Sequence, residues 1–112
     1  MDVAQALERM EGDRDLLEEL ARLFTDEWPK SVAEMEAAFD AGDATLLERL
    51  AHGLKGAAAN VGAERLSAAA SEMEKMSAAR NLKSIPAQWE LVKEEAAALL
   101  EEFKKLFRKA AH

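Results

Sequence analysis

The sequence contains no cysteine, only two prolines and five glycines, and few aromatic residues, with four phenylalanines and two tryptophans in a chain of 112 residues. Without cysteine the chain can form no disulfide, no thiolate zinc site and no cysteine nucleophile. It has no apolar run that approaches the roughly 18 residues of a membrane-spanning helix. Its first residues, with Asp2 and Glu8, lack the basic start of a signal peptide. We therefore expect a cytoplasmic protein with no membrane association.

Negative charge is concentrated in the first half of the chain. Residues 1–48 carry a net charge of −10 and residues 49–112 a net charge of +3, which together give the overall charge of −7. A domain that binds nucleic acid is expected to present a basic stripe. The acidic first half therefore argues against a nucleic-acid partner.

Composition and apolar spacing predict an all-α protein with a single domain over residues 1–112. We expect a short N-terminal leader helix over 2–10 and a long helix from Asp13 to Gly42. Three further helices follow: one capped by Asp43, one over 63–79 and a last one that begins near Pro86. Short connections at 60–63 and 80–84 favour an antiparallel up-and-down four-helix bundle.

The long helix is expected to pack an apolar face against the core while containing a proline. The core residues that we predict on it are Leu16, Leu17, Leu20, Leu23, Phe24, Val32, Met35 and Phe39. A proline within a helix removes a backbone hydrogen bond and clashes with the preceding turn. Because Pro29 falls inside this helix, we predict a kink or local break near Asp26 to Trp28.

The stretch around His52 combines an exposed histidine with small neighbours. Successive residues of a helix are about 100° apart, which places Leu50 and Leu54 on the core face and His52 on the opposite side, roughly 160° from Leu54. Gly56 lies one turn after His52 on the same outward surface. Lys55, three residues after the histidine, can bring a cation close to the ring.

The two glycines in this helix require an explanation, because glycine in a helix interior costs up to about 1 kcal/mol relative to alanine. Close helix packing is one explanation. Gly56 points outward, however, and Gly53 is the one nearer the edge of the core face. We therefore interpret Gly56 as clearing the space around His52, so that another protein can approach the imidazole.

This segment resembles the histidine-containing phosphotransfer (HPt) domain of two-component phosphorelays. The matching residues are the His52-x-Leu54-Lys55-Gly56 core, Ala57 to Ala59, and Gly62-Ala63. Helix order and length extend the resemblance more loosely over nearly the whole chain. The resemblance implies that His52 accepts a phosphoryl group on Nε2, that Lys55 assists and that Gly56 gives access.

The resemblance also implies the partners. His52 would take its phosphoryl group from a receiver-domain aspartyl phosphate, or from a kinase, and pass it to another receiver aspartate. Receiver domains and a hybrid sensor histidine kinase are the expected partners. The receiver would supply the aspartate and Mg²⁺, and this chain would bind no cofactor. We expect a monomer whose docking surface comprises His52, Arg49, Lys55, Gly56, Ala59 and the exposed edge of the preceding helix.

The histidine itself supports this chemistry. An exposed imidazole titrates near pH 6.5, so much of it is neutral at cytoplasmic pH and has a lone pair for nucleophilic attack. Phosphoryl transfer depends mostly on positioning and charge stabilisation, and Lys55 can offset phosphoryl charge. Arg49 is a weaker candidate for that role, because a surface pairing with Glu48 or a neighbouring carboxylate is the slightly better interpretation. The chain has no G-x-x-x-x-G-K-[ST] loop, so we expect no ATP binding and no independent kinase activity.

Two other classes of protein are compatible with the helical pattern. In a structural interaction module His52 would be incidental, and His52→Gln would leave partner binding and output intact. A histidine-kinase dimerisation domain resembles a helical hairpin with an acidic residue directly after the histidine and a proline a few residues later, whereas here Gly53 follows and no proline occurs between Pro29 and Pro86. The other histidine, His112, is the last residue, and we expect no metal site.

Overall fold

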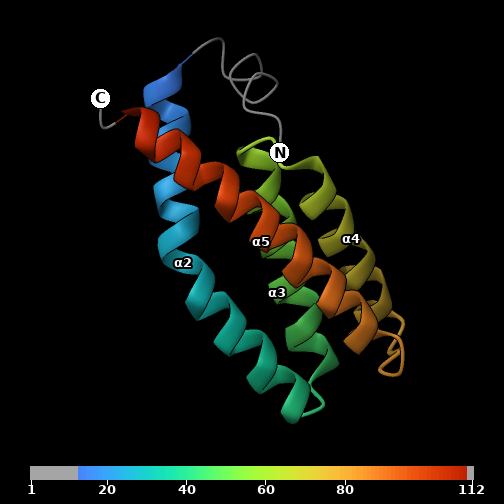
Figure 1. Ribbon diagram of the computed structural model, residues 1–112. Helices are drawn as coiled ribbons and strands as arrows, with labels where there is room; N and C mark the ends of the chain where they lie inside the picture. Colours follow the sequence, from blue (N-terminus) through green and yellow to red (C-terminus); the bar gives the residue numbers. More distant parts are fainter. Residues whose placement is uncertain (1–12, 111–112) are drawn as a thin grey trace.

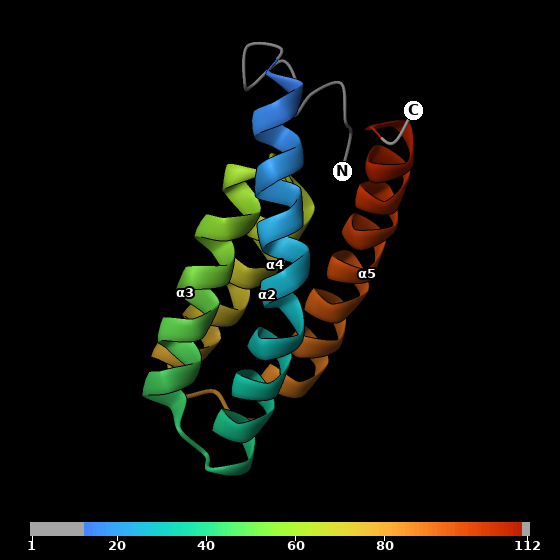
Figure 2. The same cartoon turned by 90° about the vertical axis from the view of Figure 1, so that its left-hand side faces the viewer.

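The computed structural model describes residues 13–110, which form four helices joined by short turns. They are α2 (Arg14–Asp40), α3 (Ala44–Asn60), α4 (Glu64–Ala78) and α5 (Ile85–Ala110). Consecutive helices run in opposite directions, and α2 and α5 extend beyond the other two at one end (Figures 1 and 2). The predicted up-and-down four-helix bundle is confirmed, whereas the leader helix expected over 2–10 lies outside the described residues.

The helix that carries His52 begins and ends at the residues that its sequence signals indicate. The Asp43 carboxylate accepts a hydrogen bond from the Leu46 N–H at 3.0 Å and caps the N-terminus of α3. Gly42 and Gly62 have φ values of +63° and +72°, in the left-handed region that favours glycine at the end of a helix. Gly62 therefore belongs to the turn between α3 and α4.

Of the kink or local break expected near Pro29, the break is absent, because α2 runs without interruption through this residue. Buried side chains lie on both sides of the proline, among them Phe24 before it and Met35 after it. Pro29 itself is exposed. Burial of the two halves in one core offsets the roughly 3 kcal/mol cost of a proline inside a helix, so α2 continues as one element.

Two residues that the sequence places in the core are exposed instead. Leu16 and Leu23 are 41% and 59% accessible to solvent. The buried stripe of α2 follows Leu17, Ala21 and Phe24 at helical spacing. Each exposed leucine precedes one of these residues and is therefore rotated by about 100° away from the core.

The two sides of the bundle differ in the size of their buried side chains. All six aromatic residues lie on α2 or α5, and ring contacts such as Trp28–Trp89, with centroids 6.1 Å apart, join these helices. The α3–α4 side is packed with small residues, including the fully buried Ala51, Ala58 and Ala70. Because small side chains allow helix backbones to approach closely, α3 and α4 form the tightest pair of the bundle.

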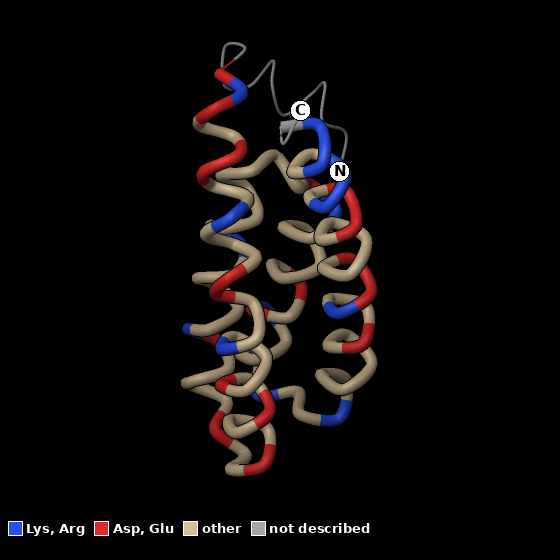
Figure 3. Tube along the Cα trace, turned by 60° about the vertical axis from the view of Figure 1, so that its left-hand side comes forward, with Lys and Arg blue, Asp and Glu red and all other residues tan. Residues whose placement is uncertain are grey.

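Charge is distributed unevenly over the helices. Acidic residues occur along the length of α2, and basic residues gather at the C-terminal end of α5 (Figure 3). None of the four described helices combines the length and the apolar character that crossing a bilayer requires.

Candidate functional site

His52 lies near the middle of α3 with its side chain 66% exposed. Its neighbour Ala51 is fully buried, and Leu54, on the opposite side of the helix, is 7% exposed. The predicted orientation of this helix is therefore confirmed. The core face anchors α3 and holds the imidazole at the surface.

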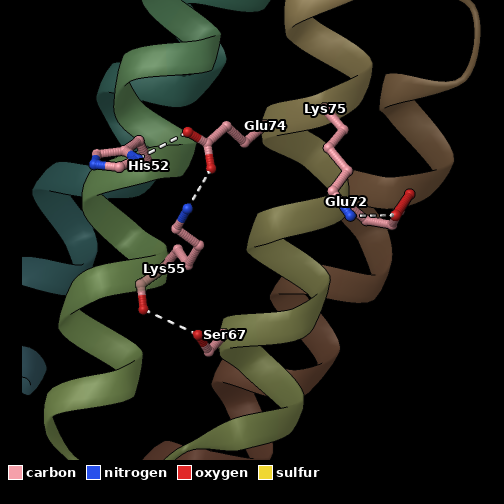
Figure 4. A network of polar contacts seen from close by, with 6 residues as sticks. All are labelled: His52, Lys55, Ser67, Glu72, Glu74 and Lys75. Carbon is pink, nitrogen blue, oxygen red and sulfur yellow. Dashed lines mark hydrogen bonds and ion pairs between the residues drawn. The ribbon is translucent and has the colours of Figure 1, made fainter.

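One carboxylate on the neighbouring helix contacts both the imidazole and the lysine. Glu74 of α4 places Oε2 at 2.8 Å from His52 Nδ1, and its Oε1 accepts a hydrogen bond from Lys55 Nζ at 2.7 Å. The three side chains form a continuous chain between α3 and α4 (Figure 4). Lys55 therefore lies close to the imidazole, as expected, but it is connected to the ring through Glu74.

The charge of Glu74 determines which ring nitrogen of His52 carries a proton. The hydrogen bond from Lys55 is the largest influence that lowers the pKa of Glu74 below its usual 4.5. Partial burial opposes this shift, and the hydrogen bond with His52 and the positive charge of Lys55 add to it. An ionised carboxylate can only accept hydrogen bonds. His52 Nδ1 must therefore donate to Glu74, which in the neutral ring leaves the lone pair on Nε2, directed away from Glu74.

A second contact fixes the position of α4 relative to Lys55. The Ser67 hydroxyl donates a hydrogen bond to the Lys55 backbone carbonyl at 3.1 Å. Helix α4 thus binds Lys55 at two points, the carbonyl through Ser67 and the ammonium group through Glu74 (Figure 4). This pair of contacts restrains the sliding of one helix along the other and keeps Glu74 opposite His52.

Gly56 is not required for helix packing. It is exposed, and a Cβ atom built on it would meet nothing within 4 Å apart from its own helix and chain neighbours. The prediction that it faces outward beside His52 is confirmed. Ala59, one turn further along, is exposed as well, so the surface that follows the imidazole along α3 carries only small side chains.

Arg49 lies one turn before His52 and is exposed. Among residues 13–110 it forms no ion pair, so the alternative pairing with Glu48 is not observed. Arg49 instead lines a groove between α2 and α3. In the same part of the chain no group of three or more histidine, aspartate or glutamate side chains is arranged to hold a metal ion.

The groove between α2 and α3 has a volume of about 470 Å³ and is largely apolar. Its apolar lining includes Leu20, Leu23, Phe24, Trp28, Met35, Leu50, Leu54, Ala57 and Val61. Gly53, directly after His52, belongs to its wall, so the groove opens beside the imidazole. Glu27 and Glu34 contribute negative charge to it.

Sequence reasoning missed Glu74 and the groove. Glu74 is one of many acidic residues, and nothing in its immediate neighbours distinguishes it. An antiparallel pairing of α3 and α4 about the turn at 60–63 provides a usable signal, because equal steps in both directions bring residue 71 opposite His52, three residues before Glu74. The groove was missed because Leu23, one of its lining residues, was expected in the core.

Comparisons with known proteins agree with this arrangement. The family model described as "Hpt domain" matches residues 19–106, and the chain belongs to this family. It is a histidine phosphotransfer carrier of phosphorelay signalling.

Among solved structures, the fold is similar to that of histidine-containing phosphotransfer protein B (HptB) from Pseudomonas aeruginosa PAO1. The two share 28% sequence identity with a TM-score of 0.88, over 97% of this chain and 95% of the other. The comparison with curated proteins gave no match.

The contacts of Glu74 lead to a prediction about its ionisation. Replacing Lys55 with alanine removes the largest influence that lowers the pKa of Glu74, so this pKa should rise toward 4.5. A carboxyl group with a lowered pKa contributes stability above its ordinary pKa, and the contribution is lost as the pH falls through the folded value. In the Lys55→Ala protein this contribution should therefore be smaller, and its loss should be complete at a higher pH.

Carbon-13 NMR of the glutamate carboxyl groups measures this shift. Lys75→Ala is the matched control, because it removes the same charge from the residue next to Glu74, while Lys75 pairs with Glu72 at 3.7 Å. Equal Glu74 titrations in the two variants would contradict the prediction.

Proposed function

We propose that His52 is the phosphoryl acceptor and that Nε2 is the reacting atom. The observation that carries the proposal is the hydrogen bond from Nδ1 to Glu74, which leaves the Nε2 lone pair exposed to an approaching partner. The donor is the aspartyl phosphate of a receiver domain or a kinase, and the acceptor in the next step is a second receiver aspartate.

The transfer needs few groups from this chain. The Nε2 lone pair attacks phosphorus, the bond between phosphorus and the aspartyl oxygen breaks, and the aspartate leaves as a carboxylate. Phosphoryl transfer depends mainly on positioning and on the stabilisation of charge. Lys55 lies three residues after His52 and supplies a cation for the transferred group, and Arg49, one turn before the ring, is a second cation at the edge of the site. The receiver supplies Mg²⁺.

The groove between α2 and α3 is the proposed docking surface for the receiver. It adjoins His52 through Gly53, and the exposed Leu23 offers apolar area that a partner can cover. Gly56 and Ala59 leave room above the imidazole. We also propose that the carrier acts as a monomer and that a hybrid sensor kinase supplies its phosphoryl group.

The first prediction concerns the acceptor. Receiver domains labelled with radioactive phosphate by their own kinases should transfer the label to the wild-type protein, and His52→Gln should abolish the transfer. The bound label should be labile in acid and stable in base, as a phosphoramidate is. A His52→Gln protein labelled at the wild-type rate would contradict the assignment, and no transfer from any receiver tested would favour the interaction module.

The second prediction concerns access to the ring. Gly56→Leu should leave the free energy of unfolding unchanged or raise it by up to about 1 kcal/mol, because the new side chain meets open space and glycine is a poor helix former. Transfer should fall by a factor of ten or more, since small displacements of reacting groups cost up to about 100-fold.

Chemical denaturation and single-turnover transfer measure these two effects of Gly56→Leu. Ala98→Leu, which enlarges an exposed residue of α5, is the control and should transfer normally. Normal transfer by the Gly56→Leu protein would contradict the steric role of this glycine.

The third prediction concerns docking. Leu23→Ala should weaken receiver binding by about 1 kcal/mol, roughly five-fold, as expected for an apolar contact within an interface. Stability should change little, because Leu23 is 59% exposed. Leu91→Ala, an exposed leucine of α5 outside the groove, is the matched control. Equal affinities of the two variants, measured by titration calorimetry with the receiver that transfers label, would exclude Leu23 from the interface.

A further inference from the structure

We propose that the groove beside His52 contains a hole that accepts one bulky apolar side chain of the receiver, and that Gly53 sets the size of this hole. The hole is formed by Leu50, Gly53, Leu54 and Ala57 of α3, all of which line the groove. The proposal rests on the assignment of the groove as the docking surface. It adds a residue that determines how tightly a receiver binds.

The spacing of the four residues is that of a hole on a helix surface. They follow one another at i, i+3, i+4 and i+7, and four residues at this spacing surround the point at which a side chain of a facing helix inserts. Leu54 is 7% exposed and lies at the base, whereas Gly53 and Ala57 are exposed at the rim. Because Gly53 has no side chain and Ala57 a small one, the hole has room for a large apolar group.

The free protein has no need of a glycine at position 53. Gly53 lies in the interior of α3, Ala44–Asn60, where glycine is less favourable than alanine. A Cβ atom built on it would meet nothing within 4 Å apart from its chain neighbours and the backbone of its own helix. Neither close helix packing nor a left-handed backbone therefore accounts for this glycine. Space for a group from outside the chain does account for it.

Gly53 and Gly56 clear different parts of the surface. Gly56 is rotated by only about 40° from His52 around the helix axis, whereas Gly53 is rotated by about 100°. Gly53 lines the groove on the α2 side, and Lys55 lies on the other side of His52, where it contacts Glu74. A side chain at position 53 would therefore narrow the groove, whereas one at position 56 would cover the imidazole.

The charges of the groove favour a protein as the occupant. Glu27 of α2 and Arg49 of α3 both line it, and among residues 13–110 neither forms an ion pair. Arg49 precedes Gly53 by one turn. An apolar centre with a charged rim is typical of protein interfaces, and charges of opposite sign on the two walls match complementary charges of a partner. A free apolar molecule would leave both charges without a partner.

Two substitutions of Gly53 test the proposal. Gly53→Ala should raise the thermal midpoint of unfolding by a few degrees, because alanine is the better helix former and its Cβ meets open space. It should nevertheless weaken receiver binding, by about three-fold, and Gly53→Leu, which fills the hole, should weaken it roughly ten-fold. A glycine with a purely structural role would instead give a lower midpoint when it is replaced.

Titration calorimetry with the unphosphorylated form of the receiver that transfers label measures the binding. Ala98→Leu is the control, because it adds a large apolar side chain to an exposed residue of α5 outside the groove and should bind as the wild type does.

A double-mutant cycle identifies the inserted side chain. Exposed leucine, isoleucine, methionine and phenylalanine residues of the receiver are replaced by alanine one at a time, and each variant is titrated with the wild-type protein and with Gly53→Leu. Contacting residues show coupling in such a cycle. One receiver substitution should weaken binding to the wild-type protein roughly ten-fold and cause no further loss with Gly53→Leu, because the hole is already filled.

Wild-type affinity of Gly53→Leu would overturn the proposal, as would a lowered unfolding midpoint of Gly53→Ala or a cycle in which no receiver residue is coupled to Gly53. The comparison of Leu23→Ala with Leu91→Ala separates these failures from that of the docking surface. Weaker binding by Leu23→Ala with no effect at Gly53 refutes the hole alone, whereas no effect at either residue refutes the groove. The acceptor assignment is not involved, since binding is measured without a phosphoryl group.

Discussion

The close approach of α3 and α4 is the constraint on which the site depends. Both helices carry fully buried alanines, Ala51 and Ala58 on α3 and Ala70 on α4, and the hydroxyl of Ser67 donates a hydrogen bond to the backbone carbonyl of Lys55. A glutamate side chain is short, so Glu74 can bond to both His52 and Lys55 only because the helices are this near. Larger side chains between α3 and α4 would move the Glu74 carboxylate away from the His52 imidazole even where the four-helix bundle still formed.

The opposite side of the bundle, formed by α2 and α5, contributes mainly to stability. Aromatic residues from α2 and α5 supply most of the buried volume there, and contacts such as Phe24–Phe103, with ring centroids 6.0 Å apart, join the two long helices. Burial of large rings contributes strongly to stability. The aromatic side, formed by α2 and α5, stabilises the fold. The alanine-rich side, formed by α3 and α4, positions the side chains of the site and tolerates the exposed Gly56, which weakens α3 slightly.

Local sequence signals were sufficient for the features that depend on one element. Asp43 capped the helix that carries His52, and the outward direction of His52 and Gly56 followed from helical periodicity alone. Features that depend on two elements were not accessible in this way. The partner of His52 on α4 requires the register between two helices, and the orientation of Leu23 requires knowledge of which helices pack against α2.

The absence of a break at Pro29 has the same physical origin. Proline opposes a helix locally, but the buried residues before and after it belong to one core, and their burial decides the outcome. A short stretch of sequence around Pro29 reveals the energetic cost of a proline in a helix, but it does not reveal the burial of residues before and after it that offsets this cost. Tertiary packing thus accounts for both the unbroken helix and the pair of residues that the sequence placed wrongly in the core.

The residues that surround His52 all lie on one helical hairpin, 44–78, whereas the groove beside it is completed by α2. The groups around His52 are therefore encoded in one stretch, whereas the groove is encoded partly there and partly in α2. If the groove is the docking surface proposed above, substitutions on the exposed face of α2 alter the choice of partner while His52, Lys55 and Glu74 keep their geometry. After a gene duplication, two such carriers could become insulated from each other through changes in a single helix, with the reacting group inherited intact by both.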